Sequence, residues 1–126
     1  MQNTFKKNEK LISKKQIDLL FSAGISKFCY PVKFLFSVEN ESEKKVIQVL
    51  FSVPKKNIKN AVDRNKIKRQ MREVYRKNKS LLNSLDKKIN IAFIYIEKLP
   101  LDFSLIENAI IHHIKKLKHS FDKKME

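Results

Sequence analysis

The stretch RNKIKRQMREVYR, residues 64–76, carries the residues that decide how this chain folds and what it can bind. If the stretch is helical, Arg64, Lys68, Arg72 and Arg76 recur at every fourth position and form one row along its side. Like charges at this spacing destabilise an isolated helix by roughly 0.2–0.5 kcal/mol per pair, so folding alone does not explain the row. A polyanionic partner would explain it.

The other side of the same predicted helix is apolar. Its members fall within one arc of the helix and can be buried against a sheet: Ile67, Met71, Val74, Tyr75 and Asn78, continued by Leu82 and Leu85. The pattern therefore predicts a helix with one face in the core and cations along the rest of its surface.

Composition indicates the same kind of partner. The chain has 126 residues, 42% of them hydrophobic, which suits one domain over residues 1–126 with a core of its own. It has 28 Lys and Arg against 13 Asp and Glu, a formal net charge of +15. Residues 54–79 hold eleven of these cations against two acids and so carry +9 of that charge. Such an excess attracts nucleic acid or an anionic membrane.

Other features limit the chemistry. The single cysteine, Cys29, excludes an internal disulfide and a cysteine-cluster zinc site, and we expect no disulfide-linked partner. The polar start, MQNTFKKNEK, has no apolar segment of a signal peptide, and no apolar run is long enough to span a bilayer. We therefore expect a cytoplasmic protein without a membrane partner.

No arrangement typical of an enzyme active site is evident. His112 and His113 are adjacent, so on a helix they point about 100° apart and cannot share a metal ion as a pair four residues apart can. We interpret them as solvated or capping side chains. The carboxylates form no clear acid–base pair, and no serine lies in the glycine turn of a nucleophile. We expect no catalytic residue and no metal site in the protein.

Periodicity predicts an α/β (α+β) two-layer sandwich. A first helix begins at Ser13 and ends near Gly24, where we expect a left-handed glycine. Strands are predicted over 30–38 and 45–53, joined as a hairpin, and a third strand over 89–96 is apolar on both faces and so internal to the sheet. A last helix begins near residue 104. The order is helix, strand, strand, helix, strand, helix, and a further short strand before Gly24 or after Phe28 is left open.

The segment SVPKKNIKNAVDRNKIKRQMREVYR, residues 52–76, resembles the signature of the bacterial ribonuclease P protein subunit. That family reads roughly S-V-S-K-K, a short loop, then A-V-x-R-N-R-x-K-R-x-x-R-E. The matching positions are Ser52, Val53, Lys55, Lys56, Ala61, Val62, Arg64, Asn65, Lys68, Arg69, Arg72 and Glu73. The order of helices and strands also follows the family over essentially the whole chain. Departures are Lys66 for the second arginine of R-N-R, Pro54 for a serine, a loop 57–60 without glycine, and Ile17 for an aromatic.

The resemblance implies an RNA partner and a fold with a left-handed β-α-β crossover. The family binds the ribonuclease P catalytic RNA, and together they cleave precursor tRNA to leave the mature 5′ end. Catalysis belongs to the RNA, with Mg²⁺ bound mainly by that RNA. The basic helix and its preceding loop are expected to bind the RNA through Lys55, Lys56, Arg64, Asn65, Lys66, Lys68, Arg69, Arg72 and Arg76.

The resemblance also implies a second surface, which holds the single-stranded 5′ leader of precursor tRNA between the first helix and the sheet. The expected residues are Lys14, Lys15, Phe21, Phe34 and Phe36. Leu35 is the alternative to the two strand aromatics, because the sequence does not settle which face of the strand meets the helix. Each of these aromatics, taken singly, is more often a core residue.

Two other classes remain open at this point. A generic RNA-binding or ribosome-associated basic module without a nuclease role would share the charge and the aromatics, but not the register of the signature. A basic amphipathic helix can also bind a membrane or an acidic protein groove, provided that its apolar face is free.

Overall fold

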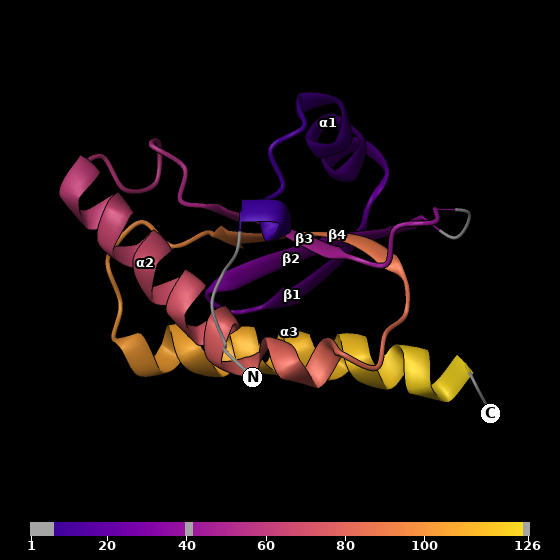
Figure 1. The fold of residues 1–126 in the computed structure, drawn as a ribbon. Helices are drawn as coiled ribbons and strands as arrows, with labels where there is room; N and C mark the ends of the chain where they lie inside the picture. The colour runs from indigo at the N-terminus through magenta and orange to yellow at the C-terminus, as the bar shows by residue number, and fades with distance from the viewer. Residues whose placement is uncertain (1–6, 40–41, 125–126) are drawn as a thin grey trace.

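In the computed structural model, four strands form one sheet, and helices cover its two faces (Figure 1). The structure describes residues 7–39 and 42–124. In chain order the elements are η1 (Lys7–Glu9), α1 (Lys14–Ala23), β1 (Ile25–Cys29), β2 (Val32–Glu39), β3 (Ile47–Ser52), α2 (Ala61–Asn78), η2 (Lys79–Leu82), β4 (Lys88–Tyr95) and α3 (Phe103–Lys124). This is the predicted α+β class and order, with β1 added.

The sheet order is β1-β2-β4-β3, so the predicted hairpin between β2 and β3 is wrong. β4 lies between them, antiparallel to β2 and parallel to β3. The physical reason lies in β4 itself. β4 is buried on both faces, since all but one of its side chains are buried, as only an internal strand allows. The internal position predicted for this strand is confirmed, and the parallel pair β3 and β4 is joined through α2.

β1 lies between the two places, before Gly24 and after Phe28, where a further short strand was left open, so the sequence did not predict its position. It pairs antiparallel with β2, from Ile25 opposite Phe36 to Cys29 opposite Val32. Four of its five residues are exposed, so the alternation that marks a half-buried strand is missing. The strand forms because the edge of β2 accepts it as a hydrogen-bonding partner. Residues 25–29 alone therefore do not predict it.

The two faces of the sheet bury different residues. α2 and α3 lie on one face and α1 on the other (Figure 1). The larger core, toward α2 and α3, includes Phe34, Phe36 and Phe93. The ring centroids of Phe34 and Phe93 are 5.2 Å apart. The smaller core, toward α1, holds Leu11, Leu20, Leu35 and Ala92.

α1 begins as predicted and ends differently. The hydroxyl of Ser13 accepts a hydrogen bond from the backbone N–H of Gln16 at 3.4 Å. Gly24 has φ −69° and ψ 157°, so the predicted left-handed conformation is wrong. Glycine is needed there because a Cβ would lie 2.4 Å from the carbonyl oxygen of Leu20. Close packing, rather than a positive φ, accounts for this residue.

The two adjacent histidines of α3 differ. His112 is exposed, whereas His113 is only 1% exposed and its ring N–H donates to the carbonyl oxygen of Val32 at 2.7 Å. The His113 ring also stacks on Phe34, with centroids 4.9 Å apart. The prediction of a solvated or capping role is therefore wrong for His113, which is a core residue. Burial lowers the pKa of this imidazole below its ordinary value.

Candidate nucleic-acid interface

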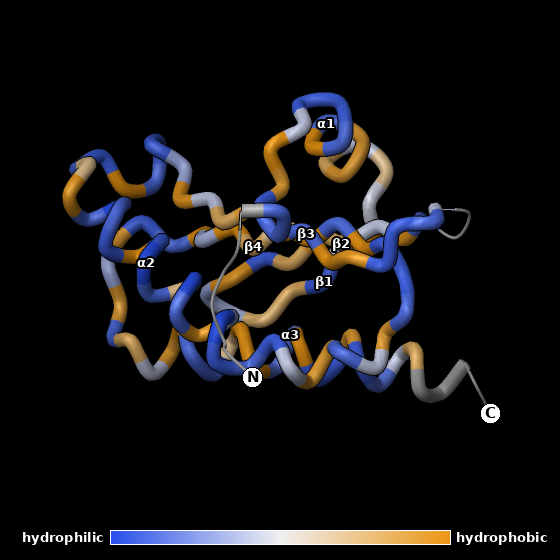
Figure 2. The backbone as a smooth tube through the Cα atoms, viewed as in Figure 1, coloured by the Kyte–Doolittle hydropathy of each residue, from blue (hydrophilic) through white to orange (hydrophobic). Residues whose placement is uncertain are grey.

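α2 presents its cations because its apolar arc is fixed against the core. The side chain of Asn60 caps the helix by accepting a hydrogen bond from Val62 N–H at 2.8 Å. Four residues of the predicted arc are buried: Ile67, Met71, Val74 and Tyr75. Hydrophilic residues, blue in Figure 2, run along α2 and are interrupted by hydrophobic ones. The predicted buried face of this helix is confirmed.

The side of α2 that points away from the core is adjacent to the predicted row of cations and does not coincide with it. At about 100° per residue, the position opposite the buried arc is that of Arg69. Four exposed residues with recognition chemistry lie on the outward part of this helix, and we call them the α2 ridge: Asn65, Lys66, Arg69 and Arg72. Of the row predicted from spacing, only Arg72 is exposed, while Arg64, Lys68 and Arg76 are half-buried on the flanks.

Arg64 contacts protein backbone. Its guanidinium donates to the carbonyl oxygens of Ile58 at 3.0 Å and Lys59 at 2.7 Å. Both carbonyls belong to the loop that leads into α2. Arg64 therefore holds this loop against the first turn of the helix.

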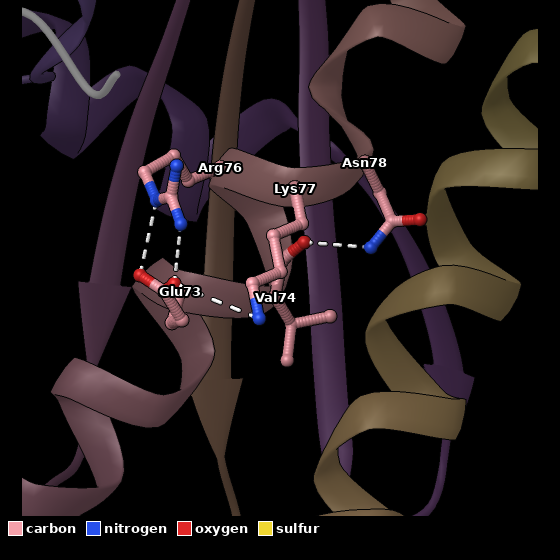
Figure 3. A network of polar contacts seen from close by, with 5 residues as sticks. All are labelled: Glu73, Val74, Arg76, Lys77 and Asn78. Atoms are coloured by element: carbon pink, nitrogen blue, oxygen red, sulfur yellow. Dashed lines mark hydrogen bonds and ion pairs between the residues drawn. The ribbon is translucent and has the colours of Figure 1, made fainter. Parts of the chain in front are cut away.

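Arg76 is paired within its own helix (Figure 3). Its guanidinium donates to both carboxylate oxygens of Glu73, at 3.0 Å and 2.5 Å, and Lys77 lies 3.8 Å from the same carboxylate. The hydrogen bond from Arg76 lowers the pKa of the Glu73 carboxyl, and the same pair raises the pKa of Arg76. Because Glu73 offsets part of its charge, Arg76 contributes less positive field than Arg69 or Arg72.

The loop before α2 adds Lys55 and Lys56, both exposed. The carbonyl oxygen of Pro54 accepts from the N–H groups of Asn57 and Ile58, and the Asn57 amide donates to the carbonyl oxygen of Tyr95 at 3.3 Å. Among the described residues no backbone has a positive φ, so the loop closes without the glycine that the family often has.

The predicted leader-binding residues of α1 lie on two sides of that helix. Leu20 is fully buried over the sheet, with Ile17 beside it. Phe21 is 49% exposed and shares one helical row with Lys14 and Ile17. Lys14 and Lys15 are both exposed, but Lys15 lies one residue further round, away from the sheet.

Phe34 and Phe36 do not lie beside Phe21, and their assignment to the leader surface is corrected. They are 2% and 7% exposed and belong to the core beneath α2 and α3, on the other face of the sheet. The intervening Leu35 faces α1 but is itself covered by it, at 5% exposed. The alternation of β2 fixes this outcome once the face toward α1 is known.

Lys33 is an exposed cation on the α1 face of the sheet that the sequence did not identify. It lies opposite Ile94 of β4 and Phe28 of β1 and is exposed. Its position two residues before Leu35 would have identified it, given the correct face. Ile94 is half-buried at the edge of the smaller core.

A buried lysine anchors α1 to the sheet. Lys88 is 7% exposed, and its ammonium group donates to the side-chain oxygens of Gln48, at 3.0 Å, and Asn90. The Asn90 amide donates in turn to the side-chain oxygen of Gln16 in α1 at 3.2 Å. Burial lowers the pKa of Lys88. No periodic pattern predicts this network, because its members come from three separate elements.

Residues 7–39 and 42–124 contain neither a candidate metal site nor a candidate membrane span. No three His, Cys, Asp or Glu side chains there are placed to hold a metal ion. None of the helices in that part of the chain is both long and apolar enough to cross a bilayer. Cys29 is a free, half-buried thiol at the end of β1.

These features define a basic α+β domain whose cationic helix packs by one face only, and the comparisons with known proteins identify its family. The profile of the Ribonuclease P family matches residues 5–118. The ribonuclease P protein component of Porphyromonas gingivalis is 36% identical over 109 residues, 82% of this chain and 79% of that protein. The RNase P proteins of Thermotoga maritima and Staphylococcus aureus superpose with TM-scores of 0.68 and 0.66, at 26% and 27% identity. Each superposition covers 86% of this chain. It covers 96% of the Thermotoga maritima chain and 94% of the Staphylococcus aureus chain. This chain belongs to the ribonuclease P protein family.

Proposed function

We propose that this chain binds the ribonuclease P catalytic RNA through the α2 ridge and the loop that carries Lys55 and Lys56. The observation that supports this most directly is the exposure of Arg69 and Arg72. Within the described ranges neither guanidinium is held by an ion pair, so both are available to phosphates. Arginine binds phosphate with two parallel hydrogen bonds, which lysine cannot do.

The loop and the ridge act as one cationic surface. Arg64 and Asn57 hold the loop in place, so the two loop lysines stand beside the start of α2 rather than sampling many positions. Ordering these cations before binding reduces the entropy lost when the RNA docks. Phosphate neutralisation releases counterions, and the affinity should therefore fall steeply with salt.

The 5′ leader of precursor tRNA is assigned to the other face of the sheet. Phe21 and Lys14 line one side of α1, and Lys33 stands on the exposed sheet surface of that face. α1 and the loop before α2 rise on the same side of the sheet in Figure 1. An unpaired strand can thus stack a base on Phe21 and place phosphates near lysines.

The chain assists cleavage without performing it. We assign the Mg²⁺ of the reaction to the RNA. The protein's cations share the screening of closely packed phosphates, which lowers the Mg²⁺ concentration that the folded RNA needs. The activity of the assembly is endonucleolytic removal of the leader to give the mature tRNA 5′ end.

A generic RNA-binding module without this role is the second candidate, since it would also need an exposed cationic ridge. The membrane alternative is disfavoured, because the apolar arc of α2 is buried. Reconstitution separates the two RNA candidates. The protein is added to a bacterial ribonuclease P RNA, and 5′ processing of precursor tRNA is measured at low Mg²⁺. Stimulated cleavage supports the proposal, and binding without any change in cleavage supports the generic module.

A further inference from the structure

A second cationic surface lies at the sheet edge far from α2. It is a groove between β1, the C-terminal half of α3 and the loop after η2, with a volume of about 1180 Å³. β1 forms one edge of the sheet, whereas α2 packs near β3 at the other edge. The proposed contacts of α2 and α1 do not use this groove.

The lining combines an apolar floor with a cationic rim. Ile25, Leu85 and Phe121 contribute apolar surface. Asp86 is the single acid among the described lining residues. The basic and imidazole side chains come from three separate segments of the chain: Lys27, Lys87, His112, His113, Lys116 and His119. The volume exceeds the roughly 300–1,000 Å³ of pockets for small molecules, so an elongated anionic occupant fits better.

We propose that this groove binds an unpaired segment of the catalytic RNA. Lysines on the rim would neutralise successive phosphates, while bases would lie on the apolar floor and stack on the exposed imidazole rings of His112 and His119. A paired RNA helix would present only its backbone and would leave the apolar floor uncovered. The groove therefore favours a single strand.

The catalytic RNA, rather than the precursor leader, is the source that the geometry favours. The groove is lined by residues of α3, and α3 packs against α2. Both helices lie on the same face of the sheet (Figure 1). α1 and the proposed leader surface lie on the opposite face. The same RNA could thus contact the α2 ridge and the groove from one side, and the inference rests on the proposed function in this respect.

An acidic peptide is the competing occupant, since the same cations would attract it. RNA fits better because every nucleotide carries a phosphate charge and a planar base. The phosphates match the lysines of the groove, and the bases match its imidazole rings. A peptide would satisfy the cations only if its acids had the same spacing.

The test uses two neighbouring lysines of α3. Lys115 and Lys116 are both exposed, but only Lys116 lines the groove. Lys116→Glu is expected to weaken binding of the full-length protein to a bacterial ribonuclease P RNA about fivefold or more, and Lys115→Glu less than about twofold. In hydroxyl-radical footprints, Lys116→Glu should remove the protection of one unpaired RNA segment, and Arg72→Ala should affect a different region. Lys27→Glu, on β1, should reproduce the Lys116→Glu pattern if the latter variant folds poorly.

The outcomes are distinct. Equal losses from Lys115→Glu and Lys116→Glu would show that only net charge matters and would overturn the groove as a site. A glutamate-rich peptide that binds wild type but not Lys116→Glu, with RNA binding unchanged by the variant, would overturn the RNA assignment in favour of a peptide. If the wild-type protein does not bind the RNA at all, the proposed function itself fails. If RNA binding and the α2 effects persist while the groove variants are neutral, the groove inference alone fails.

Discussion

The guanidinium of Arg64 donates to the carbonyl oxygen of Lys59 at 2.7 Å, across the junction between the loop and α2. Spacing alone places Arg64 in a row that faces phosphates. In the structure its guanidinium instead binds backbone carbonyl oxygens of the loop before α2. It positions the loop that carries Lys55 and Lys56, and its effect on RNA binding should be largely indirect.

Arg64→Ala is expected to loosen this loop. Removing a charged donor from two carbonyl oxygens costs about 1.5–3 kcal/mol per hydrogen bond where the bond is protected from water, and less here because Arg64 is half-buried. The N–H groups of Asn57 and Ile58, which bond to Pro54, should lose hydrogen-exchange protection. Arg72→Ala, on the exposed ridge, is the control and should leave these amides unchanged. Unchanged exchange in Arg64→Ala would show that the loop holds itself.

The α2 ridge should respond as a phosphate-binding surface. Arg69→Ala or Arg72→Ala should weaken binding to the catalytic RNA by on the order of 1–2 kcal/mol, and the slope of log K against log salt should fall by about one. Thermal melting of these variants should match wild type, because both side chains are exposed. Normal binding together with early melting would mean that the ridge is structural.

The buried arc of α2 should behave in the opposite way. Ile67 and Met71 are 2% and 0% exposed, so Ile67→Asp or Met71→Asp places a carboxylate in the core without a partner. Such a burial costs several kcal/mol, comparable with the whole stability of a small domain. Circular dichroism should show a largely unfolded chain. A folded Met71→Asp variant would contradict the packing of this helix.

The sequence predicted α2 well because a long amphipathic pattern fixes both the element and its buried face. The row of four cations was predicted opposite the apolar face, but three of the four lie half-buried on the flanks. Spacing of four identifies residues that align with each other, not those opposite the core. Arg64 and Arg76 illustrate the difference: both belong to the row, and both contact other protein groups.

The strands show what local pattern cannot supply. Alternation in β2 separates Phe34 and Phe36 from Leu35, but it does not say which set faces α1. The hairpin prediction failed because the placement of β4 between β2 and β3 is decided by pairing over long sequence separations. The sequence did not predict the hydrogen bonds of Lys88 and its partners, because these also join residues far apart in the chain.

The burial of His113 makes stability depend on pH near neutrality. Burial is the main cause of its lowered pKa, the neighbouring His112 adds to it, and the hydrogen bond to Val32 opposes it. The unfolded chain therefore binds a proton at a higher pH than the folded chain does. As the pH falls through the ordinary histidine range near 6.5, the free energy of unfolding should decrease.

Denaturant melts at pH 7.5, 6.5 and 5.5 test this linkage with a matched pair of variants. His112→Gln removes the exposed histidine and should keep most of the pH dependence. His113→Gln retains a donor for the Val32 carbonyl and should flatten the dependence while lowering stability overall. An equally steep dependence in His113→Gln would assign the effect to other groups.

The leader surface is tested at Phe21, which is 49% exposed on α1. Stacking of a base on an aromatic side chain contributes roughly 1–3 kcal/mol, so Phe21→Ala should weaken the binding of precursor tRNA by the assembled ribonucleoprotein. Mature tRNA, which has no leader, should be bound as before, and affinity for the catalytic RNA should not change, because the α2 ridge is intact.

Phe34→Ala separates a stacking role from a packing role at Phe21. Phe34 is 2% exposed in the larger core, and deleting such a ring costs about 3–5 kcal/mol of folding free energy. The Phe34 variant should melt far below wild type and bind all RNAs poorly at elevated temperature, without preference for a leader. Phe21→Ala should melt close to wild type, since this residue is already half exposed. The informative quantity is the ratio of precursor to mature tRNA affinity at a temperature where each variant is folded. A ratio that falls only for Phe21→Ala places the leader along α1. A Phe21 variant that melts as low as Phe34→Ala, with that ratio unchanged, would make Phe21 a core residue and move the leader away from α1.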